Sequence, residues 1–147
     1  MSDQNKDTAK ALNQLLQGEH MAVGVFNKFI EKTDTQSVKR TFMDVQKSHR
    51  ENIDQLEKYI NELGEKPKNN IGIKGKFGEF MLDIELIGKK DSQQLVEKAI
   101  EGVYRGINMA EKITRGELDN RSRLFVGNVL KKDRNSLIKL QNLHWYK

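Results

Sequence analysis

The sequence of 147 residues contains no cysteine and a single proline, Pro67. The absence of cysteine excludes disulfide bonds, thiolate metal sites and cysteine nucleophiles, and it fits a reducing compartment. With so little proline, the chain can form long uninterrupted helices on both sides of residue 67. No apolar run is long enough to span a bilayer, and the polar N-terminus lacks the apolar core of a signal peptide. We therefore expect a cytoplasmic protein without membrane association.

The formal net charge is +5, which by itself raises the question of a nucleic-acid partner. Basic and acidic residues alternate along every segment, as in Glu97-Lys98 and Glu111-Lys112, which is typical of solvated helix faces. The densest basic stretch, residues 131–134, is interrupted by an aspartate, and no aromatic residues are interleaved with it as a stacking surface would need. A nucleic-acid-associated protein remains an alternative, but the pattern does not favour it.

Apolar residues recur at steps of three and four along most of the chain, as at Leu12, Leu16, Val23 and Phe26. This period predicts amphipathic helices that bury one face. We expect a flexible tail over residues 1–7 and one helical domain over residues 8–147. Its helices are predicted at residues 8–32, 37–63, 77–87, 92–114 and 120–143.

The turns between these helices predict how they are connected. The turn Thr33–Thr35 is short and supplies capping side chains, so the first two long helices form an antiparallel hairpin. Gly64 and Pro67 end the second long helix. The connector that follows has more than twenty residues, enough to run about 37 Å along a helix of roughly 25 residues. The sequence therefore predicts an all-α, ferritin-like four-helix bundle, in which two antiparallel hairpins are joined by a long crossover.

Two details of this arrangement can be predicted further. The apolar segment 77–87 lies within the crossover, and we expect it to form a short helix that covers one side or end of the core. Gly102 and Gly106 lie one turn apart in the third long helix, although each glycine costs roughly 1 kcal/mol of helix stability. We expect them to allow close packing or to make room for an aromatic ring such as that of Phe26.

Three polar residues interrupt the apolar faces near the midpoints of their helices: Glu19, His49 and Asp133. Buried charges are costly unless they are paired or bind a metal. Carboxylate and imidazole groups on facing helices are the ligands that iron, manganese or zinc would use in a bundle. These three residues are therefore the candidate metal ligands.

The ligand set is incomplete for a two-metal centre. Such a centre uses a Glu from each of two helices and a Glu-x-x-His motif from each of the other two, and the sequence contains no Glu-x-x-His. The third long helix has Val103 and Gly106 at its midpoint, neither of which is a ligand. A hydrogen-bonded pair of His49 with Glu19 or Asp133 would satisfy the same groups without metal, and we favour this polar layer over a metal site.

The order of several segments, among them LNQLLQGEHMAV, LGEKP and LVEKAIEGVYRGINMAEKI, resembles a bacterial ferritin-like family of unknown function. The similarity covers about Leu12 to Leu140. It implies ligand-type residues at positions where this chain has Asn27, Asn52, Val103, Asn108 and Ser136. His49 and Asp133 are retained, so the resemblance implies a scaffold whose metal centre has been lost or never existed.

From these observations we predict a non-enzymatic packing or assembly module without a cofactor, acting as a homodimer, in which the metal centre is absent or degenerate. No catalytic residue is assigned. The alternative is an iron- or manganese-dependent oxidase or peroxide-handling protein that uses Glu19, His49 and Asp133 as ligands.

Overall fold

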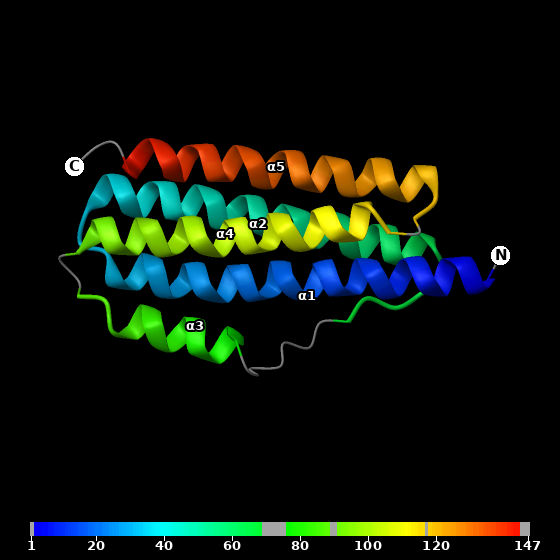
Figure 1. The fold of residues 1–147 in the computed structure, drawn as a ribbon, viewed down its shortest axis with the longest axis horizontal. Helices are drawn as coiled ribbons and strands as arrows, with labels where there is room; N and C mark the ends of the chain where they lie inside the picture. The colour runs from blue at the N-terminus through cyan, green and yellow to red at the C-terminus, as the bar shows by residue number, and fades with distance from the viewer. Residues whose placement is uncertain (1, 69–75, 89–90, 117, 145–147) are drawn as a thin grey trace.

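The computed structural model describes residues 2–68, 76–88, 91–116 and 118–144, and the regular structure in these ranges is helical. The helices are α1 (Ser2–Lys32), α2 (Gln36–Glu62), α3 (Lys76–Glu85), α4 (Ser92–Thr114) and α5 (Asn120–His144). The four long helices form a bundle, and the short α3 lies alongside α1 on the outside (Figure 1).

The direction of the helices confirms the predicted ferritin-like four-helix bundle. Helices α1 and α2 form one antiparallel hairpin, and α4 and α5 form the other (Figure 1). Helix α1 packs against α2 and α4, and α5 packs against α4 and α2. Helices α2 and α4 run in the same direction (Figure 1).

The core is formed by the apolar faces that the spacing predicts. Leu12, Leu16 and Phe26 of α1 are buried in one continuous cluster with residues of the other helices. The rings of Phe26 and Phe42 pack edge to face with centroids 5.8 Å apart, which joins α1 to α2. None of the helices in the described ranges is both long and apolar enough to cross a membrane.

Helix α1 begins earlier than the sequence predicts. It starts at Ser2 rather than near Thr8, so residues 2–7 of the predicted tail are helical. Asn5 Nδ2 donates a hydrogen bond to the Leu63 carbonyl at 3.2 Å, which fixes this first turn to the end of α2. Asp3 in the first turn also interacts favourably with the positive end of the helix dipole. These contacts come from tertiary structure and from charge placement, not from the apolar spacing.

The predicted capping role of the turn Thr33–Thr35 is wrong. Thr35 occupies the N-cap position of α2, but its side chain makes no capping hydrogen bond. Instead, the hydroxyl groups of Thr33 and Thr35 lie 3.0 and 2.8 Å from Ser92 Oγ at the start of α4. The two threonines therefore tie one hairpin to the other. At α4 the expected cap is present, since Asp91 Oδ1 accepts from the Gln94 amide at 3.0 Å.

The beginning of the crossover is attached to α1 by a side chain. Gly64 ends α2 with a φ of +79°, a conformation that glycine adopts without strain. Asn13 then donates to the Lys66 carbonyl at 3.2 Å and accepts from the Lys68 amide at 2.7 Å. These two bonds hold residues 66–68 against α1.

Helix α3 covers one side of the core, as predicted. Phe80 and Ile84 are buried against the bundle. A Cβ atom placed on Gly102 would lie 3.1 Å from Phe80 Cζ, so this glycine makes room for the ring of α3. The expected room for an aromatic ring is therefore confirmed at Gly102, where the ring is that of Phe80 and not of Phe26. The sequence of α4 shows that space is available but not which ring occupies it.

Candidate metal centre

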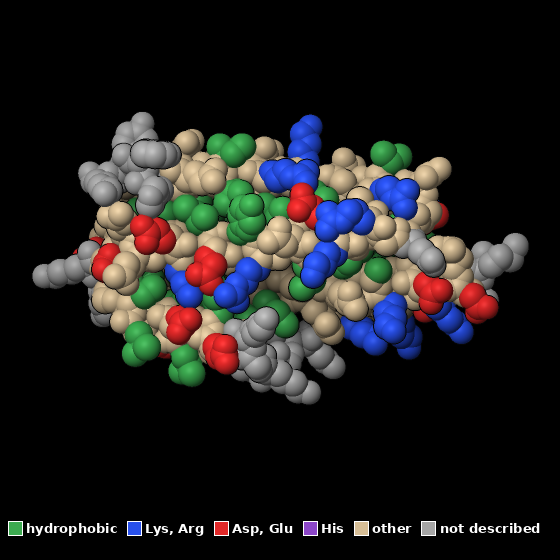
Figure 2. Space-filling model, in the orientation of Figure 1, with side chains coloured by type: hydrophobic (Ala, Val, Ile, Leu, Met, Phe, Trp, Pro, Cys, Tyr) green, Lys and Arg blue, Asp and Glu red, His purple; other side chains and the backbone are tan. Residues whose placement is uncertain are grey.

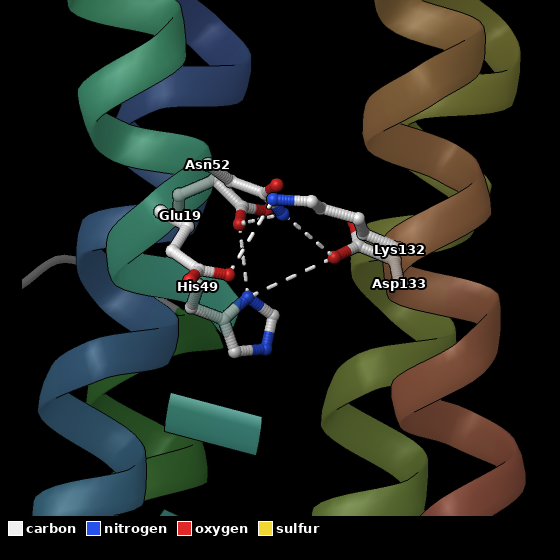
Figure 3. Close-up of polar contacts among 6 residues, drawn as sticks. Glu19, His49, Asn52, Lys132 and Asp133 are labelled. Atoms are coloured by element: carbon white, nitrogen blue, oxygen red, sulfur yellow. Dashed lines mark hydrogen bonds and ion pairs between the residues drawn. The ribbon is translucent and has the colours of Figure 1, made fainter. Parts of the chain in front are cut away.

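The three predicted ligand residues come together halfway along the bundle. Glu19 projects from α1, His49 from α2 and Asp133 from α5, and one ligand atom of each lies within 4.8 Å of the other two (Figure 3). The apolar stripes on both sides of each residue turn these three side chains inward. Only 7% of Glu19, 3% of His49 and 3% of Asp133 is exposed, so the cluster lies inside the core.

A fourth residue, Asn52, connects the two carboxylates. Its Nδ2 donates to Glu19 Oε1 at 2.9 Å and to Asp133 Oδ1 at 3.1 Å. His49 Nδ1 lies 2.9 Å from Glu19 Oε1, to which it donates, and 3.8 Å from Asp133 Oδ1. The hydrogen bonds of the polar layer that the sequence favours over a metal site are therefore present, with Asn52 as their bridge (Figure 3).

The spacing of apolar residues in the sequence does not identify Asn52 as a member of this cluster. It lies three residues after His49, which places both side chains on the same face of α2. That spacing was the available signal, together with the family resemblance that marks position 52. An asparagine on a helix is, however, usually a solvated residue, so the pattern alone could not show that its side chain is completely buried.

The polar layer is not fully satisfied. His49 Nε2 and Asn52 Oδ1 are enclosed and have no hydrogen-bond partner in the described part of the chain. Figure 3 shows His49 with one ring nitrogen turned to the carboxylates and the other turned away from them. A buried polar atom without a hydrogen-bond partner destabilises the folded state. These two atoms could therefore each take a further partner.

The electrostatics of the cluster are set by two acids beside one imidazole. Burial, together with the negative charge of Glu19, raises the pKa of Asp133 to about 7, although His49, Asn52 and Lys132 act in the opposite direction. Burial by itself would lower the pKa of His49, but the charge of Glu19, its hydrogen bond and the charge of Asp133 outweigh it and raise that pKa. Both shifts show that the cluster attracts positive charge.

Helix α4 contributes no ligand to this layer. At its midpoint the buried side chain is Val103. Glu101, the nearest acidic residue, forms ion pairs with Lys98 at 3.4 Å and Arg105 at 2.8 Å. Its carboxylate is therefore engaged at the surface.

The other positions marked by the family resemblance lie apart from the cluster. Asn27 is exposed on α1 and accepts a hydrogen bond of 2.7 Å from Gln46. Asn108 is exposed on α4, and Ser136 is buried on α5 one turn beyond Asp133. His20 follows Glu19 directly in the sequence. Its Nε2 is enclosed without a partner among the described residues, and it is not part of the ligand group.

The residues present lack the ligands for two metal ions, whereas the distances from His49 to both carboxylates match the binding of one ion. A two-metal bundle centre needs ligands from all four helices, and α4 supplies none here. Two atoms bound to one ion at about 2.1 Å lie at most about 4.2 Å apart. The distances from His49 Nδ1 to Glu19 and Asp133, 2.9 and 3.8 Å, are within this limit. The unpartnered Asn52 Oδ1 is a further oxygen donor beside them.

The fold and the buried cluster define a ferritin-like four-helix bundle with a reduced set of ligand-type residues. The chain belongs to the family described as "Domain of unknown function (DUF2383)", whose model matches residues 7–116. The family resemblance inferred from the sequence is confirmed. None of the curated proteins matches the chain.

Two solved structures share the fold. One is a two-domain protein from Anabaena variabilis with DJ-1/ThiJ/PfpI-like and ferritin-like domains. It has a TM-score of 0.80 and 22% identity over 97% of this chain. The present chain spans 40% of its length. The other, from Bacillus anthracis, is described as ferritin-like, diiron-carboxylate. It has a TM-score of 0.74 and 19% identity over 98% of this chain and 99% of that one. At these identities the likeness shows the fold alone.

Proposed function

We propose that the protein is a non-enzymatic ferritin-like bundle whose degenerate metal centre binds one divalent transition-metal ion at Glu19, His49 and Asp133. The observation that supports it is the approach of three buried donor atoms from three helices to within 4.8 Å. One imidazole nitrogen and several carboxylate oxygens suit Fe²⁺, Mn²⁺ or Zn²⁺. This proposal develops the sequence-based prediction of a degenerate centre.

The buried carboxyl groups of the cluster favour a bound metal ion over a polar layer without metal. The cluster contains two buried carboxyl groups and one imidazole, and a buried charge without compensation is costly. In the absence of metal, the raised pKa of Asp133 means that a proton supplies part of this compensation. A divalent ion would displace that proton, and the proton on His49 Nδ1 would also have to leave that nitrogen; the ion would then compensate both carboxylates.

A bound ion would join α1, α2 and α5 at the centre of the bundle, acting as a Lewis acid and as a structural link. In this role Glu19 and Asp133 would supply oxygen ligands and His49 would supply Nδ1. Asn52 would orient the carboxylates through its amide, as residues next to metal ligands commonly do. Because α4 offers no ligand, we infer that the site holds one ion and acts in stability or assembly instead of turnover.

The second candidate function is a metal-dependent oxidase or peroxide-handling protein. One observation favours it, namely a cavity of about 270 Å³ that is lined in part by Glu19, His49 and Asp133. Such a cavity would give a small molecule a route to a metal ion. This candidate predicts that the protein accelerates oxidation of Fe²⁺ by oxygen or peroxide, whereas the binding function predicts no acceleration over buffer.

Metal content tests the proposal directly. Protein stripped with chelator is dialysed against Mn²⁺, Zn²⁺ or anaerobic Fe²⁺, and bound metal is measured by mass spectrometry. We expect about one ion per chain, and we expect His49→Ala to bind none. The matched control is His20→Ala, which removes the neighbouring histidine outside the cluster and should retain the ion. His49→Gln, which fills the same space, separates loss of the ligand from loss of folding.

Two results would contradict the proposal. Wild-type protein that binds no ion would leave the polar layer of Glu19, His49, Asn52 and Asp133 as the correct description. Two ions per chain would instead show a complete dinuclear centre. The predicted homodimer and cytoplasmic location stay predictions, of which the first can be measured by light scattering after size-exclusion chromatography.

A further inference from the structure

A cavity of about 270 Å³ lies between α1 and α4 and is covered by residues of α3. Its wall is mainly aromatic and thioether: Phe26, Phe29, Phe77, Phe80, Met21 and Met109. Arg105, Gly106 and Met109 are exposed as well as lining the cavity, so they form its mouth. Glu19, His49 and Asp133 also line the cavity, and the two carboxyl groups are its buried acidic part.

The space exists because small residues face it on both long helices. Gly18 and Ala22 of α1 and Ala99, Gly102 and Gly106 of α4 all line the cavity. A Cβ atom on Gly106 would meet nothing within 4 Å. Glycine inside a helix is unfavourable relative to larger residues. Gly106 therefore leaves volume open that a side chain could fill.

The acidic part of the cavity has unused hydrogen-bond acceptors. The hydrogen bonds from His49 and Asn52 reach Glu19 Oε1 and, from Asn52, Asp133 Oδ1. In the described ranges, Glu19 Oε2 and Asp133 Oδ2 accept no hydrogen bond, yet neither is among the enclosed atoms that lack a partner. These second oxygens thus keep some accessibility. Of the positive groups nearby, Lys132 pairs with Glu51 and Arg105 with Glu101, while His49 Nδ1 faces the first oxygens, Glu19 Oε1 and Asp133 Oδ1.

We propose that this cavity binds a small arylalkylamine, with the aromatic ring among the phenylalanine and methionine side chains and the ammonium group on Glu19 and Asp133. The size agrees, since a cavity of about 150 Å³ holds benzene and 270 Å³ leaves room for a short aminoalkyl chain. Aromatic walls also attract a cation. An apolar pocket with a few convergent polar groups is the usual form of a small-molecule site.

This inference goes beyond the metal proposal and does not depend on it. An ammonium group and a divalent ion would use the same two carboxylates, so they would compete. If the metal proposal fails, the amine can still bind to metal-free protein. If the amine proposal fails, the metal stoichiometry is unaffected.

The probes are three molecules of similar size and different charge: 2-phenylethylamine, ethylbenzene and 3-phenylpropionate. Calorimetric titration into metal-free protein should show the amine binding at least tenfold more tightly than ethylbenzene, with no binding of the carboxylate. Equal affinity for the amine and ethylbenzene, or no binding of the amine, would overturn the proposal.

Two glycine variants locate the site. Gly106→Leu places a side chain in the cavity and should abolish amine binding. Gly127→Leu is the matched control, because Gly127 also lies inside a helix with nothing within 4 Å of an added Cβ but does not line the cavity. It should bind the amine like wild type. Amine binding that survives in Gly106→Leu, with both variants folded by circular dichroism, would place the amine outside this cavity.

A variant of the acidic part tests the role of charge. Asp133→Asn keeps the shape of the side chain but removes one carboxylate. We expect it to weaken amine binding at least tenfold while ethylbenzene binds as before. Unchanged amine affinity in this variant would show that Asp133 does not hold the ammonium group, contrary to the proposal.

Discussion

Asp133 is subject to opposing influences inside the bundle. Burial and the charge of Glu19 raise its pKa to about 7, against the effects of His49, Asn52 and Lys132. A carboxyl group whose pKa is higher in the folded state than in the unfolded state binds protons preferentially when folded. Its contribution to stability is therefore fully present below pH about 4 and is lost as the pH rises through about 7. The raised pKa of His49 acts in the same direction.

We predict that Asp133→Asn makes the stability of the metal-free protein less sensitive to alkaline pH. The variant cannot lose a proton at this position, whereas wild type does so at a cost of roughly 1.4 kcal/mol per pH unit. Between pH 5 and 8 the free energy of unfolding of wild type should fall by on the order of 2–3 kcal/mol relative to the variant. Urea denaturation in the presence of a chelator measures this difference. Parallel pH profiles would contradict the assignment.

Helix α3 depends on a few side chains for its position. Phe80 is buried over Gly102, and its ring also lies 4.7 Å from Lys98 Nζ and 5.3 Å from the guanidinium carbon of Arg105. Glu85 near the end of α3 pairs with Lys28 of α1. Ion pairs of such exposed groups contribute little, so the buried apolar side chains Phe80 and Ile84 are the main support.

Replacing Phe80 with Ala should destabilise the protein by about 3 kcal/mol, the cost of a cavity left by a buried aromatic ring. Hydrogen exchange in α3 should increase more than in α1 or α2. Leu82→Ala on the same helix is the control, because Leu82 is 65% exposed and its replacement should have little effect. Equal destabilisation by the two variants would show that α3 is not held through Phe80.

The charge of the whole molecule is balanced locally. On the face shown in Figure 2, Lys and Arg side chains lie among Asp and Glu side chains. Several basic residues form ion pairs across helices, as Arg121 does with Glu62, Lys132 with Glu51 and Arg134 with Glu111. The net charge of +5 is therefore accompanied by acidic side chains on this face and by ion pairs between helices.

We predict no stable complex with duplex or single-stranded DNA in a gel-shift assay at low salt. Low salt is the most demanding condition, because attraction to phosphate is strongest there. A discrete shifted band that disappears as salt is raised would support the nucleic-acid alternative instead. The contact residues could then be sought among Lys131, Lys132 and Arg134.

Much of this fold could be predicted because it depends on local chemistry. Apolar spacing predicted the long helices, and Gly64 was identified as the end of α2. The length of the crossover predicted that α2 and α4 are parallel, since a short loop cannot return to the other end of a bundle. Interruption of three apolar stripes by Glu19, His49 and Asp133 predicted that these side chains meet.

The contacts that could not be predicted join residues far apart in the chain. Asn52 looks like a surface residue until α1 and α5 place two carboxylates beside it. Threonine commonly caps helices, but the hydroxyl group of Thr35 is hydrogen-bonded to Ser92 at the start of α4 instead. In both cases the local signal is weak, and a hydrogen bond to a distant element decides the outcome.

The sequence by itself determined the helices, their connectivity and the residues that face the core, because each depends on periodicity, turn chemistry and chain length. Tertiary structure alone decided where α1 begins, which ring covers Gly102 and how Asn52 bridges the carboxylates. It also decided that a cavity opens beside them. These features depend on how side chains from separate helices share space and hydrogen bonds, and one-dimensional spacing does not contain that information.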